Sequence, residues 1–495
     1  MKKIHQLIGL CLIITLTYPA AVIAQYESSS FNLTGMGVAM PFSRDYQSLF
    51  VNPANLDLET GYEQKKAIGF FDFTSSIQTE LLTKSQLLDG LMGKSENSRL
   101  TYAEQLENVE KLALKPTAID IDLLSIGISF QTEKAGAFAF ALRDKIDFYS
   151  QIDRDLTELL WLGNQSPYFD SLVVMATNNA DSIIARPENF DPQQFSIISA
   201  FIDPSQAQSA KQLIGNTKLG FTWFREFSAG YGKRLIRTSD FEFHIGIGAK
   251  YLLGQGTIEI DGEKGEVYSS LSPLFTIDYT MLENAPLNPS ALPTDAPGLK
   301  PVGKGFGIDF GGTCIVKKQW IINAAVNDIG QITWDGNVYE LGDGKVTDID
   351  DSGIESFDIF QVINSFNGLD AILKWKGLES RTTRLNTTAR LGVGFEKFQK
   401  LRIGFDLIAP MNENQANLQR AAINAGIEFS PWPWIHLQTG FSDGGNYAPR
   451  MPAGIYFTTK EGSHEFGVAS RDILTFFQDD NPTASIAMGF LRFRY

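Results

Sequence analysis

The C-terminal part of the chain alternates between apolar and polar side chains with a period of two. From Ala389 to Glu396 the odd positions are apolar and the even positions are Arg, Gly or Glu, and residues 401–407, 423–429 and 435–441 repeat the pattern. Successive side chains of a strand point to opposite faces, so each segment is predicted to be an amphipathic β-strand. The fold class is therefore predicted to be all-β.

The same alternation recurs in earlier segments of the chain, at residues 118–130, 136–148, 217–231, 241–251, 303–316 and 451–472. A soluble sandwich also shows this pattern. Three features favour a membrane barrel instead. Many segments reach about 10 residues, enough to cross a bilayer at a tilt, whereas soluble strands average about five or six. Their second face is rich in Gly and charge, as in a polar lumen, and aromatic residues, 12% of the chain, gather near segment ends.

The last segment is the most specific indication of a barrel. It is predicted to sort its side chains onto two faces, with Tyr495, Phe493, Leu491 and Gly489 on one and Arg494, Arg492 and Phe490 on the other. A chain that stops on an aromatic residue after an amphipathic strand resembles the assembly signal of bacterial outer-membrane barrels. We therefore expect Tyr495, Phe493 and Leu491 to be read by the outer-membrane assembly machinery.

An open sheet edge in lipid leaves backbone groups unpaired, so the predicted transmembrane antiparallel sheet must close, and bacterial barrels have an even number of strands. We predict about 14 strands, within a range of 12 to 16. The segments "KFQK", "SPWPW" and "TKEG" are predicted to be periplasmic turns. The long connections at 78–117, 149–216 and 337–382 have helical periodicity and are predicted to lie outside. Residues 232–302 fit either one long hairpin or an extra short strand.

The N-terminal region divides into a leader and a plug. Residues 1–24 carry two lysines, an apolar run and a small-residue exit, which is typical of a secretory signal peptide. Residues 25–65 are apolar, are broken by Gly and Pro and have no strand partner of their own. We expect them to fill the lumen as a plug, with the barrel over residues 66–495 and the whole protein in the cell outer membrane.

The plug contains the segment "QSLFVNPANL", residues 47–56. Pro53 lacks an amide hydrogen and holds Asn52 in extended geometry, Asn52 can bond nearby backbone, and Ala54 permits close approach to the wall. An "NPA" segment before a barrel resembles the hatch of FadL-type outer-membrane transporters. The fuller "PFSRDYQSLFVNPANL" resembles an uncharacterised Bacteroidota family of outer-membrane barrels.

The FadL resemblance implies that Asn52, Pro53 and Ala54 pack the hatch beside a kinked strand that opens a lateral exit. Pro273, in a strand predicted at 266–281, is a candidate for the kink, since proline disrupts a ladder. The alternative is a rigid turn that only fills the lumen. The resemblance implies passive uptake of hydrophobic, fatty-acid-like molecules. A non-transporting scaffold or surface-attachment component of a secretion or envelope complex is the second hypothesis.

Composition excludes other classes. The formal net charge of −15 makes nucleic acid a poor partner, and Cys314 is the only cysteine after the leader, so no internal disulfide forms. We expect no enzyme and no cofactor: His244 and His436 are predicted to line the lumen, and His464 has only Ser463, Ser470 and Asp472 near it in sequence. The acidic run 348–355 begins like a calcium loop, but Ile359 stands where the loop needs Glu, so no metal site is predicted.

Membrane lipid and a hydrophobic ligand complete the expected partners. Several charged residues on the lumenal faces are expected to pair within the wall and to hold the plug rather than to form a selectivity filter. These residues are Arg390, Arg402, Asp406, Glu428 and Arg492.

Overall fold

The computed structural model describes residues 30–59, 64–91, 101–175, 181–188, 190–273, 288–293, 300–342, 344–350, 352–353, 375–397, 400–445, 447–459 and 462–495. The predicted signal peptide lies outside the described residues.

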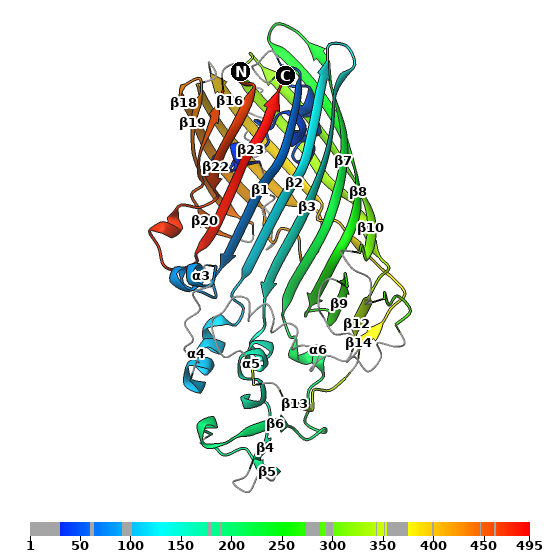
Figure 1. Cartoon of the computed structure of the whole chain (residues 1–495), viewed down its shortest axis with the longest axis vertical. Helices are drawn as coiled ribbons and strands as arrows, with labels where there is room; N and C mark the ends of the chain where they lie inside the picture. The colour runs from blue at the N-terminus through cyan, green and yellow to red at the C-terminus, as the bar shows by residue number, and fades with distance from the viewer. Residues whose placement is uncertain are drawn as a thin grey trace, which may run out of the picture.

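Fourteen antiparallel strand positions close into a barrel, as predicted (Figure 1). In chain order they are β1 (Lys66–Thr79), β2 (Thr117–Thr132), β3 (Gly136–Gln151), β7 (Lys218–Arg237), β8 (Phe241–Asp261), β10 (Gly303–Val316), β11 (Trp320–Trp334), β15 (Arg381–Arg384) with β16 (Thr388–Lys397), β17 (Leu401–Pro410), β18 (Ala422–Trp432), β19 (Ile435–Gly444), β20 (Tyr447–Arg450) with β21 (Ala453–Thr458), β22 (His464–Ser470) and β23 (Thr483–Arg494). Each pairs with its neighbours in sequence, and β23 pairs with β1, which closes the sheet.

The outer surface of the wall is apolar. Large side chains such as Phe140, Ile247, Phe310, Phe405 and Phe441 point outward and are exposed. An apolar belt around a closed sheet is the surface that a bilayer covers, so the barrel spans a membrane. In the part of the chain that the structure describes, every helix is too short or too polar to cross a bilayer.

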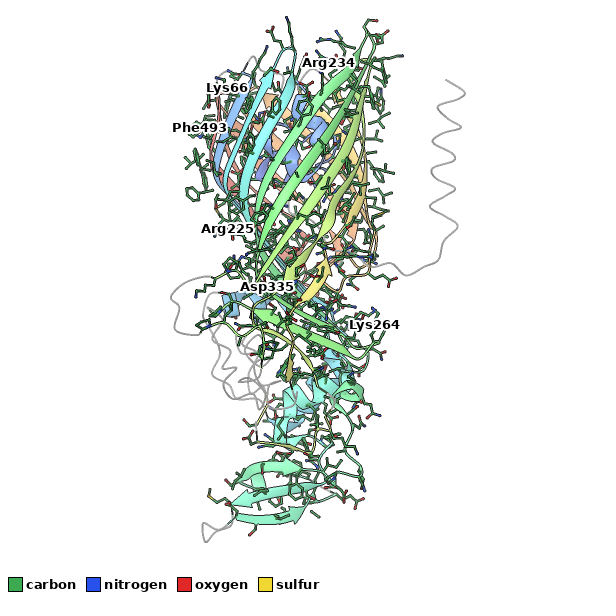
Figure 2. The ribbon with its side chains drawn as sticks, turned by 90° about the vertical axis from the view of Figure 1, so that its right-hand side faces the viewer. Lys66, Arg225, Arg234, Lys264, Asp335 and Phe493 are labelled. Carbon is green, nitrogen blue, oxygen red and sulfur yellow. The ribbon has the colours of Figure 1, made fainter. Side chains whose placement is uncertain are left out.

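The two ends of the barrel differ as expected. The turn that contains "SPWPW" lies at the same end as the C-terminus, where Trp432, Trp434 and Phe457 form a stack of rings on the outer surface. The described ends of "KFQK" and "TKEG" lie at this end too, and residues 398–399 and 460–461 lie outside the described residues. Aromatic rings of this kind mark the membrane interface. Lys66, Phe493 and Arg234 lie at this periplasmic end, and Lys264 lies at the opposite one (Figure 2).

The connections at 78–117 and 149–216 carry helices, as predicted, whereas the described residues of 337–382 form only short strands and residues 354–374 lie outside the described part of the chain. In chain order the elements of the extracellular connections are α3 (Lys84–Leu91), α4 (Tyr102–Leu112), α5 (Arg154–Leu162), η3 (Gly163–Gln165), β4 (Ser171–Met175), β5 (Asp181–Ala185), η4 (Pro192–Gln194), β6 (Ile197–Phe201), α6 (Ala210–Leu213), β9 (Glu266–Leu271), β12 (Val338–Leu341), β13 (Asp348–Ile349), β14 (Trp375–Gly377) and η8 (Leu474–Phe476). The helix α4 begins with a capping box between Thr101 and Glu104.

Part of these connections packs into an extracellular unit whose hydrophobic core also includes Leu219 of β7 and Ile260 of β8, at the end of the wall. The strands β13, β6, β4 and β5 form a four-stranded sheet in that order. Leu172 and Ala200 from this sheet pack with Leu159 and Trp161 of α5 and Leu213 of α6 in one hydrophobic core. Figure 1 places this unit beyond the extracellular end of the barrel, with β5 farthest from the wall.

Two local predictions are wrong. The described part of the strand predicted at 266–281 is β9, which ends at Leu271 and pairs with β8 and β12 instead of crossing the membrane, so Pro273 lies outside any strand; residues 274–281 lie outside the described residues. On β23, Gly489 faces inward against Phe31 and Phe490 faces outward. The register shift between β22 and β23 near these residues is a β-bulge, which reverses the alternation that the sequence pattern assumed.

The N-terminal segment lies inside the barrel near its periplasmic end (Figure 1, dark blue). We call residues 30–59 the plug. It contains α2 (Phe31–Thr34), η1 (Asp45–Phe50) and η2 (Pro53–Asp57), and the whole segment is buried apart from its ends and a few positions. Gly and Pro break any longer element, so the plug folds into short turns that fit a round lumen.

Candidate functional site: the plug and its seat

Glycines on the inner face of the wall form the seat of the plug. A side-chain Cβ at Gly404 would lie 2.7 Å from both Phe42 and Val38 of the plug, and one at Gly394 would lie 2.6 Å from Pro41. The sequence pattern predicts that these glycines line a polar lumen. In the structure they face the plug, which packs so closely against the wall that a side chain at these positions would collide with it.

The three predicted motif residues lie where the plug meets β8 and β10. Asn52 is extended, with φ −155° and ψ 104°, and its Oδ1 accepts from the amide of Ala54 at 3.1 Å. Its Nδ2 donates to Thr313 Oγ1 at 3.0 Å. Pro53 and Ala54 lie against Gly246, where a Cβ would collide with their backbone. The geometry is thus a tight turn seated on the wall, and a gating role remains a prediction.

The next residue, Asn55, makes more side-chain hydrogen bonds than any motif residue, although no sequence pattern marks it. Its Nδ2 donates to Met40 O at 2.7 Å and to Ser43 Oγ at 2.9 Å, and its Oδ1 accepts from Thr313 Oγ1 at 2.6 Å and Asn323 Nδ2 at 3.0 Å. Asn55 therefore joins two parts of the plug to β10 and β11. A buried amide can make this many bonds, but sequence alone does not indicate which ones.

The last strand binds the plug through charge. Asp45 Oδ2 accepts from Arg492 Nη2 at 3.0 Å and from Arg494 Nε at 2.9 Å, and both arginines also bond Glu465, at 2.8 and 2.9 Å. All four side chains are buried. Burial alone would raise the pKa of Asp45, but Arg494 and Arg492 outweigh it and hold the pKa below its ordinary value. Two cations and two anions thus form a balanced network between plug and wall.

The plug bridges the seam where the barrel closes. Asp45 holds β23, while the ring of the neighbouring Tyr46 fills the space over Gly69 of β1 and Gly127 of β2. Strands β1 and β23 are the first and last of the wall and pair with each other. One turn of the plug therefore contacts both sides of this seam from inside.

Of the lumenal charged residues predicted to hold the plug, some bind the plug directly and others form ion pairs within the wall. Asp406 Oδ2 accepts from the amides of Ala39 and Met40 at 2.6 and 3.0 Å, so it binds the plug directly, as Arg492 does. Arg402 instead pairs within the wall, at 3.3 Å from both Glu396 and Glu428. Arg390 is buried on the inner face.

A layer of buried charges lies between the plug and the extracellular mouth. Arg143 pairs with Asp122 and Glu226 at 2.8 Å, and its guanidinium lies 4.0 Å from the ring centre of Phe50 in the plug. Farther round the wall, Lys250 pairs with Asp328 at 2.6 Å and with Asp309 at 3.2 Å. An apolar molecule that moved past this layer would have to displace paired charges, which is unfavourable.

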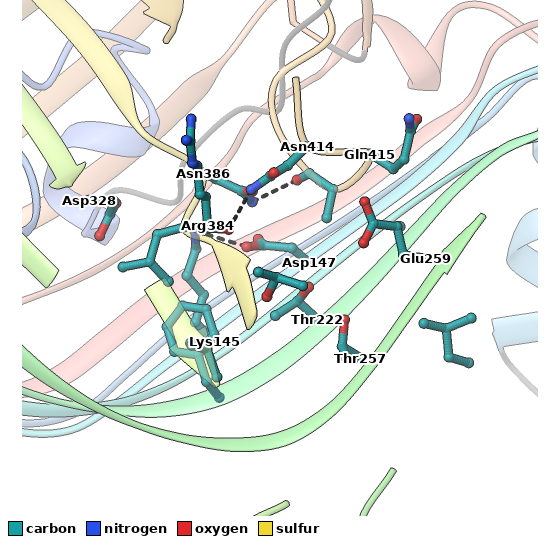
Figure 3. A pocket seen from close by; sticks show the side chains of 17 residues that line it. Lys145, Asp147, Thr222, Thr257, Glu259, Asp328, Arg384, Asn386, Asn414 and Gln415 are labelled. Atoms are coloured by element: carbon teal, nitrogen blue, oxygen red, sulfur yellow. Dashed lines mark hydrogen bonds and ion pairs between the residues drawn. The ribbon is translucent and has the colours of Figure 1, made fainter. Parts of the chain in front are cut away.

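At the extracellular mouth the inner face becomes partly apolar. Phe224, Leu252, Ile332, Trp334 and Leu385 form one buried cluster. Beside it lies a cavity of about 40 Å³ whose other walls carry Lys145, Asp147, Glu259, Asn386 and Asn414, as Figure 3 shows. A water molecule needs about 10–15 Å³ of such space, so this cavity suits a few waters and no fatty-acid-sized ligand.

The histidines are held in separate places. His436 lies between Ser430 and Thr458, at 2.7 and 2.6 Å, and stacks on Tyr456 in the inner wall. His464 stacks on Phe493 and bonds Phe490 O, while Ser470 bonds the backbone of Asp472. The sequence neighbours of His464 thus do not form a triad with it. Within the described residues no cluster of three or more His, Cys, Asp or Glu side chains suits a metal ion, and the run 348–355 lies partly outside them.

The closed wall, its apolar belt and the seated N-terminal segment define a plugged outer-membrane β-barrel. A model described as "Family of unknown function (DUF5723)" matches residues 195–460, more than half of the chain, and the protein belongs to this family. No curated protein matches the sequence.

Solved structures with a similar course of the chain include transporters of small molecules. The *Pseudomonas putida* toluene transporter TodX is 9% identical with a TM-score of 0.39, covering 95% of this chain and 98% of its own. The *Ralstonia pickettii* toluene transporter TbuX is 11% identical with a TM-score of 0.42, covering 96% and 99%. A *Pseudomonas aeruginosa* FadL homologue is 9% identical with a TM-score of 0.36, covering 95% and 98%. Similarity at this level carries no conclusion about function.

Proposed function

We propose that the protein is an outer-membrane channel for passive uptake of hydrophobic small molecules, closed by its plug in the described state. The apolar cluster at the mouth supports this function. Trp334 and Leu252 are fully or almost fully buried among Phe224, Ile332 and Leu385 on the lumenal side. A water-filled lumen is lined by polar groups, so an apolar mouth suits an apolar ligand better than an ion. The resemblance of the "NPA" segment to the FadL hatch agrees with this.

Passage requires the plug to move, because the plug and the charged layer fill the lumen below the mouth. The plug is held by side-chain hydrogen bonds and ion pairs from Asp45, Asn55 and Asp406 and by apolar packing against the inner face of the wall. The neutral hydrogen bonds of Asn55 can be replaced by bonds to water at a modest net cost, about 0.5–1.5 kcal/mol each, whereas the buried ion pairs of Asp45 cost more to break. Asn52, Pro53 and Ala54 are proposed to set the position of the plug against β8 and β10. Tyr495, Phe493 and Leu491 remain the proposed assembly signal.

Uptake of a fluorescent fatty acid into liposomes that contain the protein tests this function. The variant Trp334→Gln, which places an amide in the apolar mouth, should slow uptake. Trp375→Gln, which changes a tryptophan of β14 in the extracellular connections, is the matched control and should leave uptake unchanged. Equal uptake with the wild-type protein and with empty liposomes would exclude a hydrophobic channel.

A surface-attachment role is the second candidate, and the extracellular unit favours it. Residues from α4, α5, α6 and the four-stranded sheet share one hydrophobic core with the extracellular ends of β7 and β8, which gives a partner a folded surface beyond the barrel. A partner that co-purifies with the wild-type protein and is lost when residues 170–201 are replaced by a short linker would support attachment. Unchanged fatty-acid uptake by the same variant would separate the two functions.

A further inference from the structure

Two adjacent phenylalanines, Phe476 and Phe477, are 73% and 81% exposed. They lie in the connection between β22 and β23, at η8. Unlike the connections that extend beyond the end of the barrel, this orange-red turn projects sideways from the wall near β20 (Figure 1). The pair is therefore presented beside the barrel and not at the extracellular tip.

The turn that carries the pair is held in place by Asp472, a buried side chain. Its carboxylate accepts from the amides of Met451, Leu474 and Thr475 at 3.0, 3.0 and 3.1 Å, and from Thr475 Oγ1 at 2.7 Å. The amide of Thr483, the first residue of β23, donates to Thr475 Oγ1 at 2.8 Å. The rings are thus exposed on a fixed turn tied to the wall at both ends.

The helix α3 lies on the same side of the barrel. Leu87 of α3 packs with Ile77 of β1 and Ala484 of β23, which both point outward, so the helix covers the outer surface of the seam at its extracellular end. The helix also binds the turn, because Lys84 pairs with Asp479 at 3.1 Å. The turn and α3 together form a collar on the outside of the wall.

The collar continues the lipid-facing surface. Val468 on β22 and Ile486 on β23 point outward and are exposed next to the connection that holds the two rings. Moving a phenylalanine side chain out of water is favourable, so two rings that stay in water lose this stabilisation. Because the apolar belt lies in the bilayer and the turn joins β22 and β23 of that belt, the two rings lie next to lipid-facing residues of the wall.

We propose that Phe476 and Phe477 insert into the outer leaflet of the membrane, at the boundary between headgroups and acyl chains. The pair fixes the height of the barrel in the bilayer on the side of the β1–β23 seam. The occupant of this surface is lipid, and the function goes beyond any transport through the lumen.

Spin labels on single cysteines test the proposal in the full-length protein, reconstituted in lipid vesicles, on a C314S background. The label at F477C should collide more with oxygen, which partitions into lipid, and less with a water-soluble nickel chelate. F405C, on the lipid-facing surface of β17, and I183C, 70% exposed on β5, are the two references. The oxygen-to-nickel collision ratio at F477C should exceed that at I183C several-fold and approach that at F405C.

A ratio at F477C equal to that at I183C would place the rings in water and overturn the proposal. Low collision with both reagents would place them against protein and overturn it as well. F476C provides an independent site on the same turn if the first variant fails to fold, as judged by loss of the compact, heat-modifiable form on gels.

Discussion

We first predict how much the ion pairs between the plug and the last strand, β23, contribute to the free energy of unfolding. These ion pairs are formed by Asp45, Arg492, Arg494 and Glu465. Asp45→Asn keeps the size and shape of the side chain and removes its charge. The two arginines would then share Glu465 alone, and one buried positive charge would lack a partner. We expect this variant to fold into the same barrel with a weaker plug.

The expected loss follows from the burial of the network. Breaking a buried ion pair by removing one partner costs about 3–5 kcal/mol. The amide oxygen of asparagine can still accept a hydrogen bond from Arg494 or Arg492, worth about 1.5–3 kcal/mol when the donor is charged, so it recovers part of the loss. The free energy of unfolding should therefore fall by about 2 kcal/mol, the difference between the middles of the two ranges.

Unfolding by urea in lipid vesicles, followed by tryptophan fluorescence, measures this loss. Asp335→Asn, which changes an exposed acid in an extracellular connection, is the matched control and should change stability by less than about 0.5 kcal/mol. In the double variant with Arg494→Gln, the remaining Arg492–Glu465 pair is balanced. The double variant should lose less than the sum of the two single variants.

The effect should also depend on pH. Because the pKa of Asp45 is lowered in the folded state, its contribution to stability is present above the pKa of the unfolded chain, near 3.8, and is lost as pH falls through the lower folded value. The difference between wild type and Asp45→Asn should thus be constant near neutral pH and shrink in strong acid. Equal stability of the two proteins at pH 7 would refute the reasoning.

Three further predictions concern the seat and the charged layer. Asn55→Ala should expose the plug to protease more than Asn52→Ala, because Asn55 makes more bonds with the plug and the wall; equal cleavage would contradict this. Gly311→Ala should loosen the plug, because the new Cβ would collide with the side chain of Asn52. Gly312→Ala on the same strand is the control, because its Cβ would lie no closer than 3.9 Å to any neighbouring atom. The same protease assay should show more cleavage of the plug in the first variant than in the second. Lys250→Met should lower the free energy of unfolding in urea by about 3–5 kcal/mol, because it leaves the buried carboxylates of Asp309 and Asp328 without their cation. Lys304→Met changes an exposed lysine and should have little effect. Similar unfolding curves for the two variants would contradict a stabilising role of the charged layer.

The wall of the barrel could be predicted from the sequence because a sheet in lipid must have apolar side chains on its outer face and no unpaired strand edge. Alternation of side chains such as those from Ala389 to Glu396 determines which face meets lipid, and closure follows from the need to pair every strand edge in a membrane. The strand number is confirmed for the same reason. The sequence predicts either a long hairpin or an extra short strand within residues 232–302. The described residues show both, because β8 and β9 form a hairpin and β9 is a short strand outside the wall.

The remaining features depend on contacts that no local pattern reveals. The bulge at Phe490 reverses the alternation within one strand, and Gly404 is a glycine because of Phe42, more than 300 residues earlier. Asn55 follows the "NPA" segment directly, yet its partners Thr313 and Asn323 belong to distant strands. Only the folded barrel brings these residues together.

Electrical conductance across a planar lipid bilayer tests the central claim, that the plug closes the lumen, most directly. The wild-type barrel should show no steady ion current, and a variant that lacks residues 30–59 but keeps the compact, heat-modifiable form should conduct. The variant with both Asp45→Asn and Asp406→Asn should open intermittently, because the plug loses two of its attachments to the wall. A folded deletion variant as silent as the wild type, or a wild-type barrel that conducts as well as the deletion, would contradict the account.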